Sequence, residues 1–88
     1  MTTKDDVIDA FKNGYKMSAG NYFTDGHSLF LFGNKIAEHT PNGIRVTNAG
    51  WDTSTTNKTL YRIAPNLERK KGVMHMNGVP WNGDWTDI

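Results

Sequence analysis

Four Asn-Gly pairs divide this chain into short segments. They are Asn13-Gly14, Asn42-Gly43, Asn77-Gly78 and Asn82-Gly83, spread over 88 residues. Both residue types tolerate positive φ angles, which tight hairpin turns and helix C-caps require. The spacing leaves room only for short elements, and it therefore predicts hairpins rather than long helices.

The length of the chain limits it to one domain, residues 1–88, with a small core. The sequence has no cysteine, which excludes disulfides and thiolate metal sites. The longest apolar run, residues 29–32, is far shorter than the roughly 20 residues of a membrane span. No apolar segment of the kind found in secretory signals follows the first methionine. We therefore expect a cytoplasmic protein with no membrane partner.

Residues 3–12 are predicted to form a helix, within an N-terminal segment that covers residues 1–14. Thr3 can cap this helix, and Asp5 and Asp6 place negative charge near the positive end of its dipole. Asn13-Gly14 ends it. The predicted core stripe consists of Val7, Ile8 and Phe11.

Residues 15–49 carry a strand pattern with short links, which predicts an antiparallel β-meander. The predicted strands are residues 15–23, 28–32, 35–40 and 44–47. A second helix is predicted over residues 53–64, with Leu60, Ile63 and Ala64 on its buried face. Residues 71–88 are predicted to form a C-terminal hairpin and tail, in which Pro80 restricts its strand to an edge or to a very short length.

This order of elements predicts an α+β domain in which two short helices pack on one face of a small antiparallel sheet. Residues 29–32 are apolar on both faces, so the second face of the sheet needs a cover as well. Either the N-terminal helix covers that face or a second subunit does. The pattern therefore leaves a homodimer open, through Phe30 and Phe32 or through Leu29 and Leu31.

Three segments have a distinctive order and spacing. They are residues 20–37 (GNYFTDGHSLFLFGNKIA), residues 48–56 (NAGWDTSTT) and residues 77–85 (NGVPWNGDW). Together they resemble a family of small accessory proteins from tailed bacteriophages, over about residues 18–86 and without the N-terminal helix. The resemblance implies a phage origin, a non-virion role in the host cytoplasm and no specific chemistry.

The net charge is only +1, but five cations gather in one segment. They are Lys58, Arg62, Arg69, Lys70 and Lys71, against a single Glu68. This basic patch, combined with aromatic side chains, would suit a nucleic-acid backbone. The simpler interpretation is a solvated helix face followed by a charged loop.

Hydroxyl side chains gather at the start of the second predicted helix. Free backbone N–H groups and hydroxyls such as those of Thr53 and Thr55 could bind a phosphate there. Asp52 would repel an anion at the same place, and a cap made by Asp52 or Thr53 explains the pattern equally well. A small nucleotide-binding protein or enzyme is therefore a third hypothesis.

Aromatic residues offer a partner-binding hypothesis. Trp51, just before the second helix, is expected to plug the core. Trp81 and Trp85, together with Tyr61, either close one end of the core or anchor a protein partner.

The histidines do not form a catalytic or metal-binding pattern. His27, His39 and His75 lack metal-ligand spacing. Asp25, His27 and Ser28 could make a triad only if neighbours on a strand shared a face, which they do not. We expect no enzyme, no metal and no cofactor. The leading hypothesis is an accessory protein that binds and inhibits a host protein or defence complex, with nucleic-acid binding as the alternative.

Overall fold

The computed structural model describes residues 2–88, which contain two helices and nine strands. In chain order these are α1 (Lys4–Asn13), β1 (Lys16–Ala19), β2 (Tyr22–Asp25), β3 (Ser28–Leu31), β4 (Asn34–Thr40), β5 (Gly43–Val46), α2 (Ser54–Ile63), β6 (Leu67–Lys70), β7 (Val73–Met76), β8 (Val79–Pro80) and β9 (Thr86–Asp87).

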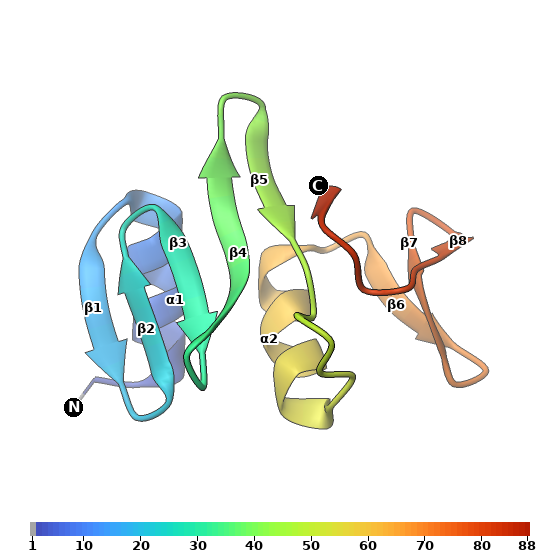
Figure 1. Cartoon of the computed structure of the whole chain (residues 1–88), viewed down its shortest axis with the longest axis horizontal. Helices are drawn as coiled ribbons and strands as arrows, with labels where there is room; N and C mark the ends of the chain where they lie inside the picture. The colour runs from blue at the N-terminus through green and yellow to red at the C-terminus, as the bar shows by residue number, and fades with distance from the viewer. Residues whose placement is uncertain (1) are drawn as a thin grey trace.

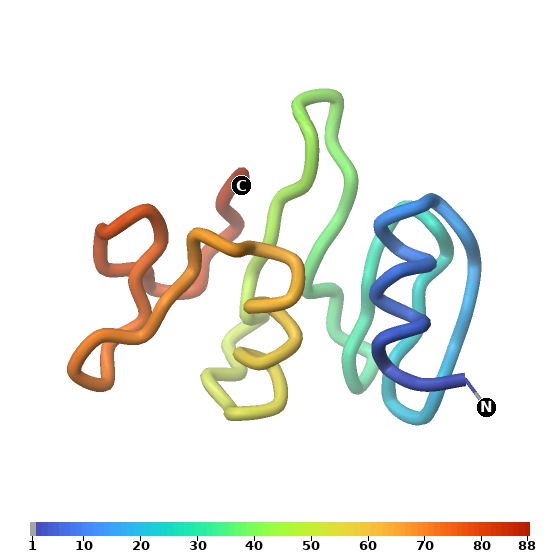
Figure 2. The backbone as a smooth tube through the Cα atoms, turned by 180° about the vertical axis from the view of Figure 1, so that it is seen from behind, coloured from blue at the N-terminus to red at the C-terminus, as the bar shows by residue number. Residues whose placement is uncertain are grey.

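The strands form two antiparallel sheets. The large sheet has the order β1-β2-β3-β4-β5-β9, and the small sheet has the order β6-β7-β8. In Figure 1, α1 lies behind β2 and β3, and in the reverse view of Figure 2 it lies in front of them, whereas α2 lies beside β4 and below the end of β5. Buried residues of both helices join one core with Leu29 and Leu31 of β3. The small sheet lies beyond α2, away from α1 (Figure 1). This arrangement confirms the predicted α+β fold class.

The core lies between the helices and the inner face of the large sheet. Its buried side chains come from both helices, from strands β3 to β5 and from the small sheet. The members with no more than 2% exposure are Val7, Ile8, Phe11, Leu29, Leu31, Ile36, Ala37, Val46, Leu60 and Ala64. Since the apolar stripe of each helix was visible in the sequence, this packing follows directly from the pattern.

The ends of α1 are set by local hydrogen bonds. The backbone N–H of Thr3 donates to Asp6 Oδ2 at 2.8 Å, and Thr3 Oγ1 accepts from the Asp6 N–H at 3.3 Å. Gly14 ends the helix in the left-handed region with φ 82°. Both predicted helix boundaries are therefore confirmed to within one residue.

One strand prediction is wrong, and two strands were not predicted. The single strand predicted over residues 15–23 is wrong: β1 and β2 are separate strands joined by a turn at Gly20, whose φ is 58°. Strand β6 was missed because only Leu67 of its four residues is buried, so no alternation marks it. Strand β9 is only two residues long, too short to leave a sequence pattern.

The two faces of β3 have different environments. Leu29 and Leu31 are buried under the helices, whereas Phe30 lies on the outer face with its ring 5.8 Å from that of Phe23. Neither helix covers this outer face, because α1 lies on the inner side of the sheet (Figure 2) and the buried residues of α2 join the same core as Leu29 and Leu31. The expectation that the N-terminal helix covers this second face of the sheet is therefore wrong.

The Asn-Gly pairs at Gly43 and Gly78 adopt positive φ angles, 135° and 80°, as predicted. Gly26, in the turn between β2 and β3, also has a positive φ, 93°. Gly26 carries a second constraint, because a Cβ placed there would lie 2.7 Å from the backbone oxygen of Gly14 at the end of α1. A Cβ at Gly78 would have nothing within 4 Å.

This contrast predicts unequal effects of two alanine substitutions. Gly78→Ala should cost about 1 kcal/mol, the strain of a left-handed alanine. Gly26→Ala should cost clearly more, because the α1 end must also move away. Urea unfolding of both variants measures the difference, and equal losses would show that α1 does not pack on the β2–β3 turn in this way.

Candidate functional site

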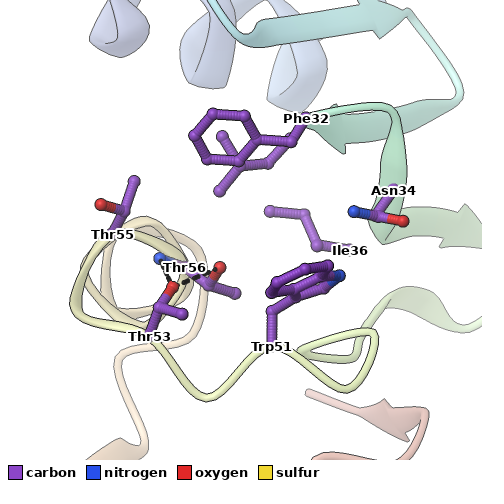
Figure 3. A pocket seen from close by; sticks show the side chains of 8 residues that line it. Phe32, Asn34, Ile36, Trp51, Thr53, Thr55 and Thr56 are labelled. Carbon is purple, nitrogen blue, oxygen red and sulfur yellow. Dashed lines mark hydrogen bonds between the residues drawn. The ribbon is translucent and has the colours of Figure 1, made fainter.

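An apolar pocket of about 440 Å³ opens between the β3–β4 turn and the start of α2. Its lining consists of Leu31, Phe32, Asn34, Ile36, Trp51, Thr53, Thr55 and Thr56. Figure 3 shows Phe32 and Trp51 on opposite sides of the pocket, with Ile36 between them and the threonines on the α2 side. None of these lining residues is ionisable, so the pocket suits an uncharged side chain or molecule.

A β-bulge in β4 supplies the floor of this pocket. The pairing of β3 with β4 shifts between Leu29–Ala37 and Phe30–Lys35, which leaves Ile36 as the extra residue. Ile36 and Ala37 are both buried, 1% and 0% exposed, although they are consecutive in a strand. The bulge therefore turns Ile36 toward the helices, where it meets the pocket.

Phe32 occupies a backbone conformation that disfavours its residue type. Its φ is 53°, it precedes Gly33 with φ 79°, and its side chain is 61% exposed. Asn77 holds the corresponding place in the β7–β8 turn, with φ 55° before Gly78. A large exposed ring where asparagine fits better is not explained by folding, and such strain is often found at functional sites.

Trp51 is 55% exposed, which corrects the expectation that it plugs the core. A tight turn holds its backbone: the Trp51 N–H donates to the Asn48 oxygen at 2.8 Å, and the Gly50 N–H donates to Asn48 Oδ1 at 2.9 Å. This turn places the indole outside the core, on the rim of the pocket opposite Phe32 (Figure 3).

The threonines at the start of α2 serve the helix and the pocket wall. Thr53 caps α2: its Oγ1 accepts from the Thr56 N–H at 3.3 Å and donates to Thr56 Oγ1 at 3.1 Å (Figure 3). Thr53 and Thr55 both line the apolar pocket. Their role in anion binding stays a prediction, and the hydrogen bonds of Thr53 support the capping interpretation.

The basic patch is exposed but partly paired with carboxylates. Arg62 lies 3.0 Å from Asp5 of α1, Arg69 lies 3.4 Å from Asp52, and Lys70 lies 3.2 Å from Glu68. Lys58 and Lys71 are exposed as well. These pairs reduce the positive potential that the five cations would otherwise create.

The structure places the three aromatic candidates in two locations. Tyr61 and Trp81 both reach Met74: the Tyr61 hydroxyl donates to its sulfur at 3.3 Å, and the Trp81 backbone N–H donates to its oxygen at 2.8 Å. The Trp81 indole N–H also donates to Thr86 Oγ1 at 2.9 Å. Trp85 is 39% exposed and lies against Arg45 at the β5–β9 edge.

Glu38 organises the charges on the outer face of the sheet. Its carboxylate accepts hydrogen bonds from Arg45 and, at 3.3 Å, from Lys35, although Glu38 is only 8% exposed. The side-chain hydrogen bond from Arg45 is the main cause that lowers the pKa of Glu38 from its usual value of 4.5. The Arg45 guanidinium in turn lies 4.7 Å from the centre of the Trp85 ring.

His39 packs against the end of α1. The His39 ring packs 4.6 Å from the Phe11 ring, with Nε2 at 2.6 Å from the Phe11 backbone oxygen. Within residues 2–88, no three His, Asp or Glu side chains gather closely enough to hold a metal ion.

Neither described helix combines the length and apolar character that crossing a bilayer requires.

Sequence reasoning considered Phe32 for a dimer contact but missed it as a pocket residue, and it missed Trp51 as an exposed residue. The available signal was the Phe-Gly-Asn segment between two strands, in which phenylalanine takes the place that asparagine takes at Asn77. Trp51 gave no such signal, because a tryptophan before a helix fits a core equally well.

Comparison with models of known protein families gives a match over most of the chain. The family model described as Kyanoviridae Gp96 protein matches residues 2–84. This match supports the expected phage family, and it includes α1, which lay outside the resemblance. No curated protein and no solved structure matches the chain.

The strain at Phe32 predicts an unusual outcome for Phe32→Asn. Asparagine tolerates the left-handed region, and the lost ring is mostly exposed, so thermal stability should stay equal or rise by up to about 1 kcal/mol. Differential scanning calorimetry measures this directly. A marked loss of stability would show that the ring belongs to the core and not to a site.

The lowered pKa of Glu38 predicts a pH dependence. The ionised carboxylate stabilises the fold above its unfolded pKa, and this stabilisation disappears as the pH falls through the lower folded pKa. The stability advantage of wild type over Glu38→Gln should therefore be full at pH 7 and shrink below about pH 4.5. Urea unfolding of both proteins tests this. An advantage that does not change with pH would contradict the ion-paired arrangement.

Proposed function

We propose that this chain, which belongs to the Kyanoviridae Gp96 protein family, is a non-catalytic phage accessory protein that binds a host protein. The binding site in this proposal is the apolar pocket between Phe32 and Trp51. The expected result of binding is modulation or inhibition of a host enzyme or defence complex.

The observation that carries the proposal is the pair of exposed aromatic side chains on opposite sides of one apolar pocket. Phe32 and Trp51 are 61% and 55% exposed, and each is fixed by a turn with left-handed residues. Large aromatic rings with a fixed backbone lose little conformational freedom on binding, and such residues dominate the energy of protein interfaces. The uncharged lining favours an aliphatic or aromatic side chain of the partner as the group that enters.

The nucleic-acid alternative has weaker support. It uses the basic patch at Lys58, Arg62, Arg69, Lys70 and Lys71, where three of the five cations already pair with carboxylates. Binding through such a patch would fall steeply with salt concentration, because it depends on the release of counterions. Binding through the apolar pocket would not.

The test compares capture of host proteins, from lysate with and without nuclease treatment, by wild type, two pocket variants and a control variant. Trp85→Ala and the double variant Lys58→Glu with Arg62→Glu are tested beside them. Phe32→Asn and Trp51→Ala each remove one pocket wall and should weaken binding of the captured protein about 30-fold or more. Tyr15→Ala is the matched control, because Tyr15 is 66% exposed and lies outside the pocket lining. It should bind like wild type.

Two outcomes would contradict the proposal. The first is a captured protein that binds all variants equally, or that is lost with Trp85→Ala and retained with Phe32→Asn. The second is a complex that disappears with nuclease treatment and that Lys58→Glu with Arg62→Glu abolishes. That second result would establish the nucleic-acid alternative instead.

A further inference from the structure

The large sheet ends at β1, and the outer edge of this strand is exposed. Lys16 and Ser18 are exposed, and no strand in residues 2–88 pairs with β1 on the side away from β2. Figure 1 shows β1 at the end of the sheet nearest the N-terminus, with α1 behind the neighbouring strands and no segment on the outer side of β1. The direction of the backbone groups along this edge follows from the register of the sheet.

A hydrogen bond between the ends of β2 and β3 shows in which direction these backbone groups point. The Phe32 N–H donates to the Asn21 oxygen at 2.9 Å, so this pair, and by alternation the Phe23–Phe30 pair, is hydrogen-bonded between β2 and β3. Tyr22 and Thr24 therefore turn their backbone groups toward β1, where they face Ala19 and Met17. The N–H and C=O groups of Lys16 and Ser18 consequently point off the edge of the sheet.

The other three sheet edges carry features that block further pairing. Strand β9 has two residues, β8 ends in Pro80, and β6 exposes Glu68, Arg69 and Lys70 in succession. Short strands, proline and runs of charge are the usual means by which proteins protect sheet edges. Strand β1, with the sequence Lys-Met-Ser-Ala, has only one charge and no proline.

We propose that β1 pairs antiparallel with β1 of a second copy of this chain, so that the two large sheets become one continuous sheet. The pairing centres on Met17, which lies opposite Met17 of the partner subunit. In this register Ser18 faces Lys16 of the partner subunit, and the outward N–H and C=O groups of both residues are all satisfied.

Three features of this register suit a second copy as the occupant. Met17 is partly buried against the core on the inner face of the sheet. In the proposed register this apolar side chain lies beside Met17 of the partner subunit. It also keeps the two Lys16 side chains apart, since each faces a serine. Finally, Lys16 already lies opposite Asp25 of its own chain, so its charge has a compensating neighbour on the same face.

Two substitutions at the exposed Ser18 test the register. Ser18→Glu places a carboxylate opposite Lys16 of the partner subunit, twice per dimer, and should tighten the dimer about threefold or more. Ser18→Lys places a cation there and should weaken it by a similar factor or abolish it. Sedimentation equilibrium over a range of protein concentrations measures both dissociation constants, with circular dichroism as the check that each variant folds.

A strict monomer at millimolar concentration would overturn the proposal. So would a dimer whose dissociation constant is the same in wild type, Ser18→Glu and Ser18→Lys. If Phe23→Ser abolished such a dimer, the contact would lie on the outer sheet face, where Phe23 is 36% exposed, and not at the β1 edge. Opposite shifts for the glutamate and lysine variants would establish the edge pairing.

Discussion

The packing of both helices on one face of the large sheet is the constraint on which the rest of the structure depends. Leu29 and Leu31 of β3 face this layer and contribute to one core with residues of α1 and α2. The helices are also joined directly, because Arg62 pairs with Asp5 at 3.0 Å and Lys12 donates to the Arg62 oxygen at 3.0 Å. The apolar contacts supply most of the stability, since the exposed ion pair contributes little.

The pocket is a consequence of that packing. Because α2 packs against the same core as β3 and β4, its first turn comes close to the β3–β4 turn, and Ile36 of the bulge forms the floor of the pocket between them. Phe32 and Trp51 then stand at the two rims rather than in the core (Figure 3). The same packing leaves the outer sheet face with Phe23, Phe30 and the Glu38 charge cluster, which neither helix covers.

Much of the fold could be predicted from the sequence, because local patterns report local structure. The cap residue Thr3 and the apolar stripes of both helices predicted the helices, and the Asn-Gly pairs predicted several of the turns. The pocket could not be predicted in this way, because it depends on the bulge at Ile36 and on the position of Trp51 relative to β3. These are long-range relations that no periodicity records. Strand β6 could not be predicted for a related reason: its charged residues are exposed, and the strand is formed by pairing with β7 rather than by burial of its own side chains.

The central claim is that the Phe32–Trp51 pocket is the surface that contacts the partner. The most direct measurement is an NMR titration of the isotope-labelled protein with its captured host partner, following backbone amides and the three indole N–H signals. We predict the largest changes at the Trp51 indole and at the amides of residues 31–36 and 53–56. Changes centred on residues 58–71, or on the Trp81 and Trp85 indoles with Trp51 unaffected, would contradict the account.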